Sequence, residues 1–137
     1  MSIQGRPKPV VTVLGEPFWA ACNERRLVVQ RCLGCQQLRH YPQERCPLCY
    51  AAEYDWAPLS GRGEVYSYTV SHRPFHPAWQ EHAPYVVATI ELEEGVRMVS
   101  DLIGADPDSI KIGQGVEITF EALDDFGLIP RFRVVKD

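Results

Sequence analysis

Four cysteines in the first half of the chain are spaced as metal ligands. They form two C-x-x-C pairs, Cys32 with Cys35 and Cys46 with Cys49. A tight turn at each pair points backbone N–H groups at the sulfurs, and two such turns brought together bind one ion tetrahedrally. The spacing therefore predicts a site with these four ligands. We expect zinc, one structural ion per chain, rather than iron, because zinc is the commoner occupant.

A closed set of four thiolates indicates a structural and not a catalytic metal. It leaves zinc no open position at which water or a substrate carbonyl could bind. We interpret the cluster as a structural metal site. The energy of metal binding, on the order of 10 kcal/mol in comparable sites, stabilises a small fold. His40 lies between the pairs and is an alternative ligand. Cys22 lies in a helix-like apolar segment, which predicts a buried thiol rather than a nucleophile.

The elements that must position these cysteines are one short helix and a series of strands. A helix is predicted over residues 16–23, and a strand over 26–32 runs into the first pair. Alternating apolar residues then predict five strands, over 63–72, 85–92, 97–103, 116–121 and 131–135. Asp106 is expected to cap a helical turn between the third and fourth of them. This order is typical of an OB-fold barrel, with a five-stranded sandwich as the alternative.

Composition and charge narrow the class of protein. The chain has 137 residues, of which 45% are hydrophobic, and no apolar run long enough to span a bilayer or form a signal core. We therefore expect a cytoplasmic protein. The predicted division of the chain is an extended segment over residues 1–15, a short helix and zinc ribbon over 16–59 and a barrel over 60–137. Residues 60–137 carry seven basic against thirteen acidic side chains. Such an acidic barrel disfavours nucleic acid.

Several aromatic and basic residues are candidates for contact with a partner or ligand. Phe18 and Trp19 on the predicted helix, and Phe75 and Trp79 in the loop over 72–84, are expected at a partner interface. The alternative for the loop is a solvated segment whose prolines limit its freedom. Arg73 in the same loop is available to a phosphate or carboxylate. No nucleophile motif or glycine-rich phosphate loop is recognisable, which favours a role without independent catalysis.

Two pairs of residues on the predicted barrel strands have alternative interpretations. Arg131 and Arg133 are candidates for binding an anionic small ligand, although a solvated strand face is favoured. Tyr66 and Tyr68 could stack on nucleic-acid bases, but they share a strand face with Val70 and are expected to face the core.

The order of the segments resembles a known family. The stretches that carry the resemblance are "PFW", "LVVQRC", "CPLC", "GRGEVYSYTV", "PYVVATIEL", "DPDSIKIGQGVEITFE" and "PRFRVV". They are similar to acyl-CoA-associated proteins with a rubredoxin-like zinc ribbon followed by an OB-fold, over residues 16–135. All four paired cysteines match that family's metal ligands, whereas Gln36 stands where many relatives have Gly. The family offers no catalytic residues to carry over.

The resemblance implies a non-catalytic accessory subunit of a thiolase-fold enzyme that acts on CoA thioesters, in thiolysis, condensation or retro-aldol cleavage. The expected assembly is a hetero-oligomer that shares a CoA thioester, without nucleic acid or membrane. Alternatives are a partner of a hotdog-fold enoyl-CoA hydratase, a free-standing acyl-CoA binder and a single-strand nucleic-acid-binding protein. The acidic barrel disfavours the last of these.

Overall fold

Strands form most of the computed structural model, which describes residues 2–3, 8–72, 84–104 and 106–135. The elements are β1 (Ser2–Ile3), α1 (Glu16–Asn23), β2 (Leu27–Cys32), β3 (Leu38–Arg39), β4 (Tyr54–Leu59), β5 (Arg62–Ser71), β6 (Tyr85–Leu92), β7 (Arg97–Ile103), a 3₁₀ turn (Pro107–Ser109), β8 (Gly115–Leu123) and β9 (Gly127–Val134). Within these ranges, no helix is long and apolar enough to cross a membrane.

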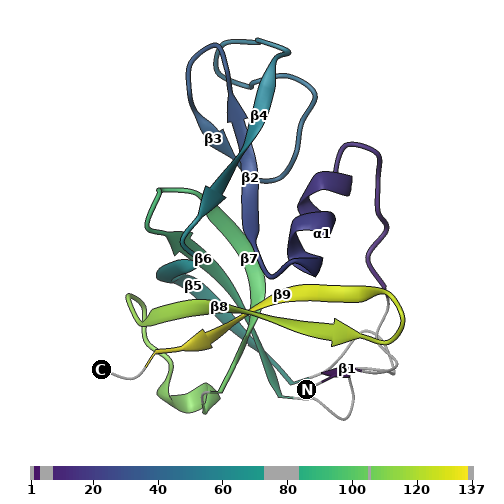
Figure 1. Ribbon diagram of the computed structural model, residues 1–137. Helices are drawn as coiled ribbons and strands as arrows, with labels where there is room; N and C mark the ends of the chain where they lie inside the picture. The colour runs from purple at the N-terminus through teal and green to yellow at the C-terminus, as the bar shows by residue number, and fades with distance from the viewer. Residues whose placement is uncertain (1, 4–7, 73–83, 105, 136–137) are drawn as a thin grey trace.

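Strands β5 to β9 close into the barrel that the sequence predicts (Figure 1). Antiparallel pairs join β5 to β6, β6 to β7, β5 to β8 and β8 to β9, and a short parallel pair between β7 and β9 completes the ring. The carboxylate of Asp106 accepts a hydrogen bond from the amide of Asp108 and caps the 3₁₀ turn. The OB-fold prediction is therefore confirmed.

A smaller sheet of three strands in the order β3-β2-β4 projects above the barrel in Figure 1. Cys32 ends β2, and the other three paired cysteines lie in the loops that connect the strands of this sheet. β4 pairs with β2 from Leu59 to Tyr54, although its sequence YDWAPL does not alternate and was not expected to form a strand. Pro58 cannot donate to a neighbouring strand, and it is tolerated because β4 lies at the edge of this sheet.

Helix α1 packs against both β2 and β9 and joins the two sheets into one core. Its buried residues are Phe18, Ala21 and Cys22, and the same core includes Val29 from β2 and Phe132 from β9. The prediction that Cys22 is a buried thiol is confirmed, and this burial raises its pKa to about 12. This core contains residues from both sides of residue 60, where the sequence predicts a boundary between two domains. That boundary stays a prediction.

The expectation that Tyr66 and Tyr68 face the core is wrong. Their side chains are 45% and 38% exposed, whereas Val65 is buried. A register shift between Val65 and Ser67 interrupts the pairing of β5 with β6, so simple alternation fails at this point. The guanidinium of Arg97 lies 3.7 Å from the ring centre of Tyr66, which gives that exposed ring a cationic neighbour.

Candidate functional site

The four paired cysteines meet at the outer end of the three-stranded sheet. Their Sγ atoms all lie within 4.8 Å of one another. Those of Cys32 and Cys49 are 3.5 Å apart, and those of Cys35 and Cys46 are 3.6 Å apart. Tetrahedral zinc with bonds of about 2.3 Å requires sulfur spacings of about 3.8 Å, so the cluster fits a four-thiolate metal site.

Backbone amides favour the thiolate forms of Cys32 and Cys46, the first cysteine of each pair. Cys32 Sγ accepts hydrogen bonds from the amides of Cys35 and Gly34, which hold its pKa below the usual range. The amides of Cys49 and Leu48 do the same for Cys46 and lower its pKa to about 6. This is the amide arrangement that the C-x-x-C spacing predicts.

The tight turns around the cluster restrict which residues can occupy them. Gln36 and Tyr50 follow the second cysteine of each pair and have positive φ values of 67° and 65°. Glycine adopts this conformation without strain, which explains why glycine would suit position 36. At Gly34 a Cβ atom would lie 2.9 Å from that of Ala51 and 3.1 Å from Cys49 Sγ, so close packing excludes a larger residue there.

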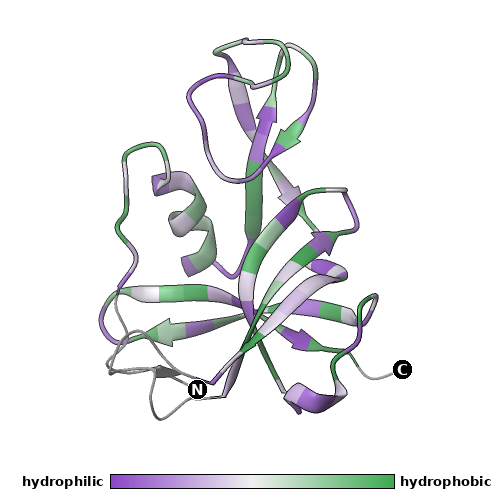
Figure 2. Cartoon of the chain, turned by 180° about the vertical axis from the view of Figure 1, so that it is seen from behind, coloured by the Kyte–Doolittle hydropathy of each residue, from purple (hydrophilic) through white to green (hydrophobic). Residues whose placement is uncertain are grey.

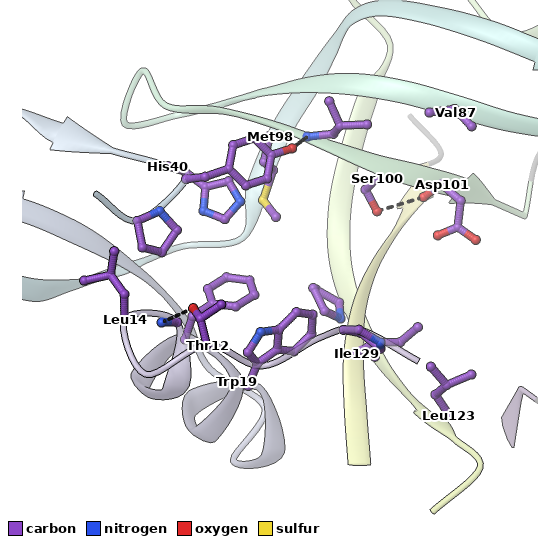
Figure 3. A pocket seen from close by; sticks show the side chains of 17 residues that line it. Thr12, Leu14, Trp19, His40, Val87, Met98, Ser100, Asp101, Leu123 and Ile129 are labelled. Carbon is purple, nitrogen blue, oxygen red and sulfur yellow. Dashed lines mark hydrogen bonds between the residues drawn. The ribbon is translucent and has the colours of Figure 1, made fainter. Parts of the chain in front are cut away.

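A cavity of about 490 Å³ lies between α1, the ribbon and the barrel. Its walls come from the segment before α1, from residues 40–42 and from the strands β6 to β9 (Figure 3). The lining residues are mainly apolar and include Leu14, Phe18, Trp19, Met98, Leu123 and Ile129. The sequence analysis missed this cavity, because segments far apart in the chain each contribute only a few of its residues.

His40 carries a buried polar atom of this lining that has no partner among the described residues. Its Nδ1 is buried without a hydrogen bond. Its imidazole lies between the rings of Phe18 and Tyr41, with ring centres 5.2 and 4.2 Å away. Other polar groups are engaged: Thr12 Oγ1 accepts from the Gly15 amide, and Tyr41 Oη accepts from the Val99 amide. Among the described residues His40 does not belong to the metal cluster.

Acid should destabilise the protein through His40. Burial lowers the pKa of its imidazole from 6.5 to about 4. Between these values the unfolded chain binds a proton that the folded chain does not, so the free energy of unfolding falls as pH falls. We expect a loss of about 2 kcal/mol between pH 7 and pH 5.

Urea unfolding at pH 5, 6 and 7 tests this effect in the unaltered chain and in His40→Phe. Protons also compete with the metal for the cysteines, but they do so in both proteins. The difference between the two profiles therefore isolates His40, and equal pH dependence would contradict the prediction.

Exposed apolar side chains either line the cavity or are close in the chain to residues that line it, and we call them the apolar rim. They are Val10, Val11, Val13, Tyr41 and Val99. Figure 2 shows the hydrophobic residues along the segment that leads into α1. Val10 and Val13 are 88% and 83% exposed, while Pro9, Thr12 and Leu14 of the same segment line the cavity. Clusters of this kind on a protein surface commonly mark interaction sites.

The residues predicted to contact a partner differ in how far the structure buries them, and some lie outside the described residues. Phe18 is only 6% exposed and belongs to the core, which corrects its expected place at the surface. Trp19 is partly buried, packs edge-on against Phe126 and lines the cavity. The other predicted contacts of this group, Arg73, Phe75 and Trp79, lie outside the described residues.

Arg131 and Arg133 differ although they are two residues apart on β9. The guanidinium of Arg131 is buried and donates to the carboxylates of Asp101 and Glu121. The solvated face favoured from the sequence is therefore wrong for Arg131, and an external anion would have to displace both carboxylates. Arg133 is exposed and paired with Glu117.

Comparison with known families covers most of the chain. Residues 19–55 match the rubredoxin-like zinc ribbon domain of ChsH2, and residues 56–121 match the C-terminal OB-fold domain of ChsH2. A solved structure described as the Ltp2-ChsH2(DUF35) aldolase has a chain that superposes with a TM-score of 0.84 at 42% identity, over 93% of this chain and 98% of that one.

Three relatives illustrate the range of similar proteins. A probable enoyl-CoA hydratase alpha subunit of Thermomonospora curvata is 43% identical over 93% of this chain, which spans 40% of that relative's length. A DUF35 domain-containing scaffold protein of Methanocaldococcus jannaschii is 36% identical, over 80% of this chain and 78% of the relative. The benzoylsuccinyl-CoA thiolase subunit BbsA of Thauera aromatica is 34% identical, over 69% of this chain and 63% of the relative.

Proposed function

Because the chain belongs to the ChsH2 (DUF35) family of proteins with a zinc ribbon and an OB-fold, we propose that it is an accessory subunit of a thiolase-fold enzyme. In this role the chain supports a partner that acts on CoA thioesters and does no chemistry alone. The observation that carries the proposal is the superposition along nearly the whole of a chain from an Ltp2-ChsH2 aldolase. The similarity to a thiolase subunit supports the same class of partner.

The metal in this proposal is structural zinc, held by Cys32, Cys35, Cys46 and Cys49. The observed sulfur spacings and amide hydrogen bonds suit a closed tetrahedral site. Such an ion supplies no catalytic position, and it fixes the outer end of the ribbon relative to β2 and β4. The partner enzyme therefore provides all the reacting groups.

The apolar rim is the surface that we assign to the partner. Tyr41 and Val99 are each about half exposed, and the amide of Val99 donates to Tyr41 Oη, so the ribbon and β7 present them side by side. Aromatic side chains in such positions are common anchors of interfaces. Covering the rim would also place the cavity at the junction between the two proteins.

Co-purification from the native host tests the proposal. The tagged chain should retain a thiolase-fold enzyme identified by mass, and a Tyr41→Ser/Val99→Ser variant should bind that enzyme at least about tenfold more weakly. Ile112→Ser, which removes an exposed apolar residue that is not part of the cavity lining, should leave binding unchanged. Turnover of a CoA thioester by the 137-residue chain alone would contradict the accessory role.

A second candidate is suggested by the Thermomonospora relative, whose name is that of a hydratase subunit. Recovery of an enoyl-CoA hydratase in place of a thiolase-fold enzyme would favour this partner. The nucleic-acid alternative predicts saturable binding of a labelled oligonucleotide at low salt with a steep salt dependence. We expect no such binding, because the chain carries a net charge of −4.

A further inference from the structure

The ribbon contains a buried arginine whose charge has no carboxylate partner among the described residues. Arg39 on β3 is only 8% exposed, and it takes part in none of the ion pairs that these residues form. Its guanidinium donates to two neutral oxygens instead, Oε1 of Gln30 at 2.6 Å and the carbonyl of Gln43 at 3.0 Å. A buried cation is costly unless a negative charge lies near it.

The other two arginines of the ribbon have no such need. Residues 27–59 contain three arginines. Arg31 is paired with the carboxylate of Asp55 at 2.6 Å. Arg45 is exposed, so water solvates its charge. Arg39 is therefore the ribbon cation that requires a negative partner other than the described carboxylates.

The strand register places Arg39 on the face of the ribbon sheet that carries a metal ligand. Gln30 of β2 lies directly opposite Arg39 of β3, and Cys32 lies two residues further along β2 (Figure 1). Directly opposite side chains, and side chains two residues apart in a strand, share one face of a sheet. Tyr54 of β4 lies opposite Cys32, and the guanidinium of Arg39 is 5.3 Å from the centre of its ring. One tyrosine is thus the neighbour of both the cation and a metal ligand.

A second metal ligand is also near this arginine. Arg39 and Cys46 line the same pocket, which lies between the ribbon and the turn that joins β6 to β7. The amides that donate to the sulfurs of Cys32 and Cys46 carry no net charge. Four thiolates around a divalent ion leave two negative charges, so the amides do not balance the centre on their own.

We infer that Arg39 is the counter-ion of the four-thiolate metal centre. Its charge stabilises the two negative charges that remain when a divalent ion is bound, and the metal centre in turn offsets the cost of burying the guanidinium. Charges attract through a weakly screening protein interior without direct contact. The inference rests on the metal site of the proposed function and is independent of the partner enzyme.

The same charge should favour divalent over trivalent ions. A ferric ion leaves one negative charge on four thiolates, whereas a ferrous or zinc ion leaves two. A nearby cation stabilises the more negative centre by more, so Arg39 should raise the potential of an Fe(III)/Fe(II) couple at this site. Access of water to the centre also raises this potential. Loss of the cation and loosening of the fold therefore shift the potential in opposite directions.

Arg39→Met and Arg39→Lys test the inference on the isolated full chain. In competition with a chelator, Arg39→Met should bind zinc at least about tenfold more weakly than the unaltered chain. In the iron-loaded chain, its Fe(III)/Fe(II) potential should be lower by at least about 59 mV, which is tenfold in the one-electron equilibrium. Arg39→Lys keeps the charge and should remain near the unaltered chain in both measurements.

A matched control removes charges from the same sheet without changing its net charge. Arg31→Met/Asp55→Asn deletes an ion pair on the strands β2 and β4, and it should leave the zinc affinity and the iron potential unchanged. The inference is overturned if Arg39→Met matches the unaltered chain in either measurement, if its iron potential rises, or if Arg39→Lys behaves like Arg39→Met. If Arg39→Met does not fold, Arg39→Lys decides: a potential near the unaltered value supports the inference, and a fall of about 59 mV overturns it.

These outcomes can be told apart from failure of the proposed function. A chain that binds neither zinc nor iron would overturn the metal site and the role of Arg39 together. If the unaltered chain and Arg39→Met bind zinc equally, the metal site stands and the role of Arg39 alone fails. Both measurements use the isolated chain, so neither depends on capture of a thiolase-fold enzyme.

Discussion

Cys46→Ser is expected to abolish tight zinc binding and to disorder the ribbon beyond β2. Three thiolates and a weak hydroxyl cannot hold a closed four-sulfur site, and structural zinc contributes on the order of 10 kcal/mol to the folding of comparable modules. The outer loops depend on the metal, because Cys35 and Cys49 are exposed and the turns around them bury little apolar surface. Strands β5 to β9 have their own pairing and should persist.

Metal analysis and amide NMR spectra check both parts of this prediction. The unaltered chain should hold about one zinc per molecule, and Cys46→Ser should lose the resonances of residues 33–53 while keeping those of the barrel. Cys22→Ala is the matched control, because its thiol is buried away from the cluster and its loss should leave the metal content unchanged. Freshly isolated protein without zinc or iron would refute the metal assignment.

Arg131→Met should destabilise the barrel by about 3 to 5 kcal/mol, the usual cost of removing one partner from a buried ion pair. The side chains of Asp101 and Glu121 are only 14% and 12% exposed, so each would lose the charge-assisted hydrogen bonds of Arg131 at a place where little water can replace them. The three residues lie on β7, β8 and β9, and their hydrogen bonds link these strands.

Arg133→Met is the matched control on the same strand. Its ion pair with Glu117 is exposed, and such pairs contribute about 0 to 1 kcal/mol. Urea unfolding at pH 7 compares the two variants. A loss of less than about 1 kcal/mol in Arg131→Met would show that water reaches the two carboxylates and that the pair is not effectively buried.

The barrel and the metal ligands could be predicted because each depends on local patterns. Alternating apolar residues identify β6 and β8, and the C-x-x-C spacing places Cys32 near Cys35 before any tertiary contact is known. β4 escaped prediction because its place in the sheet depends on pairing with β2 and not on its own sequence.

The pairing of Arg131 could not be predicted for a similar reason. Its carboxylate partners lie 30 and 10 residues away in the chain, and only closure of the barrel brings them together. The cavity likewise requires α1, residues 40–42 and the barrel strands to be assembled. No single segment shows that Nδ1 of His40 is buried, since "RHYPQ" alone is typical of a polar turn.

The position of β4 determines which part of the chain could be transplanted onto another protein. The two matched domains meet between residues 55 and 56, in the middle of β4. A cut at that point would divide the strand that edges the ribbon, and would separate Val29 and Phe18 from the barrel residues that they cover. The segment to transfer to another protein is therefore the whole of residues 16–135. Exchanging either half between relatives would require redesign of the apolar surface where the two halves meet.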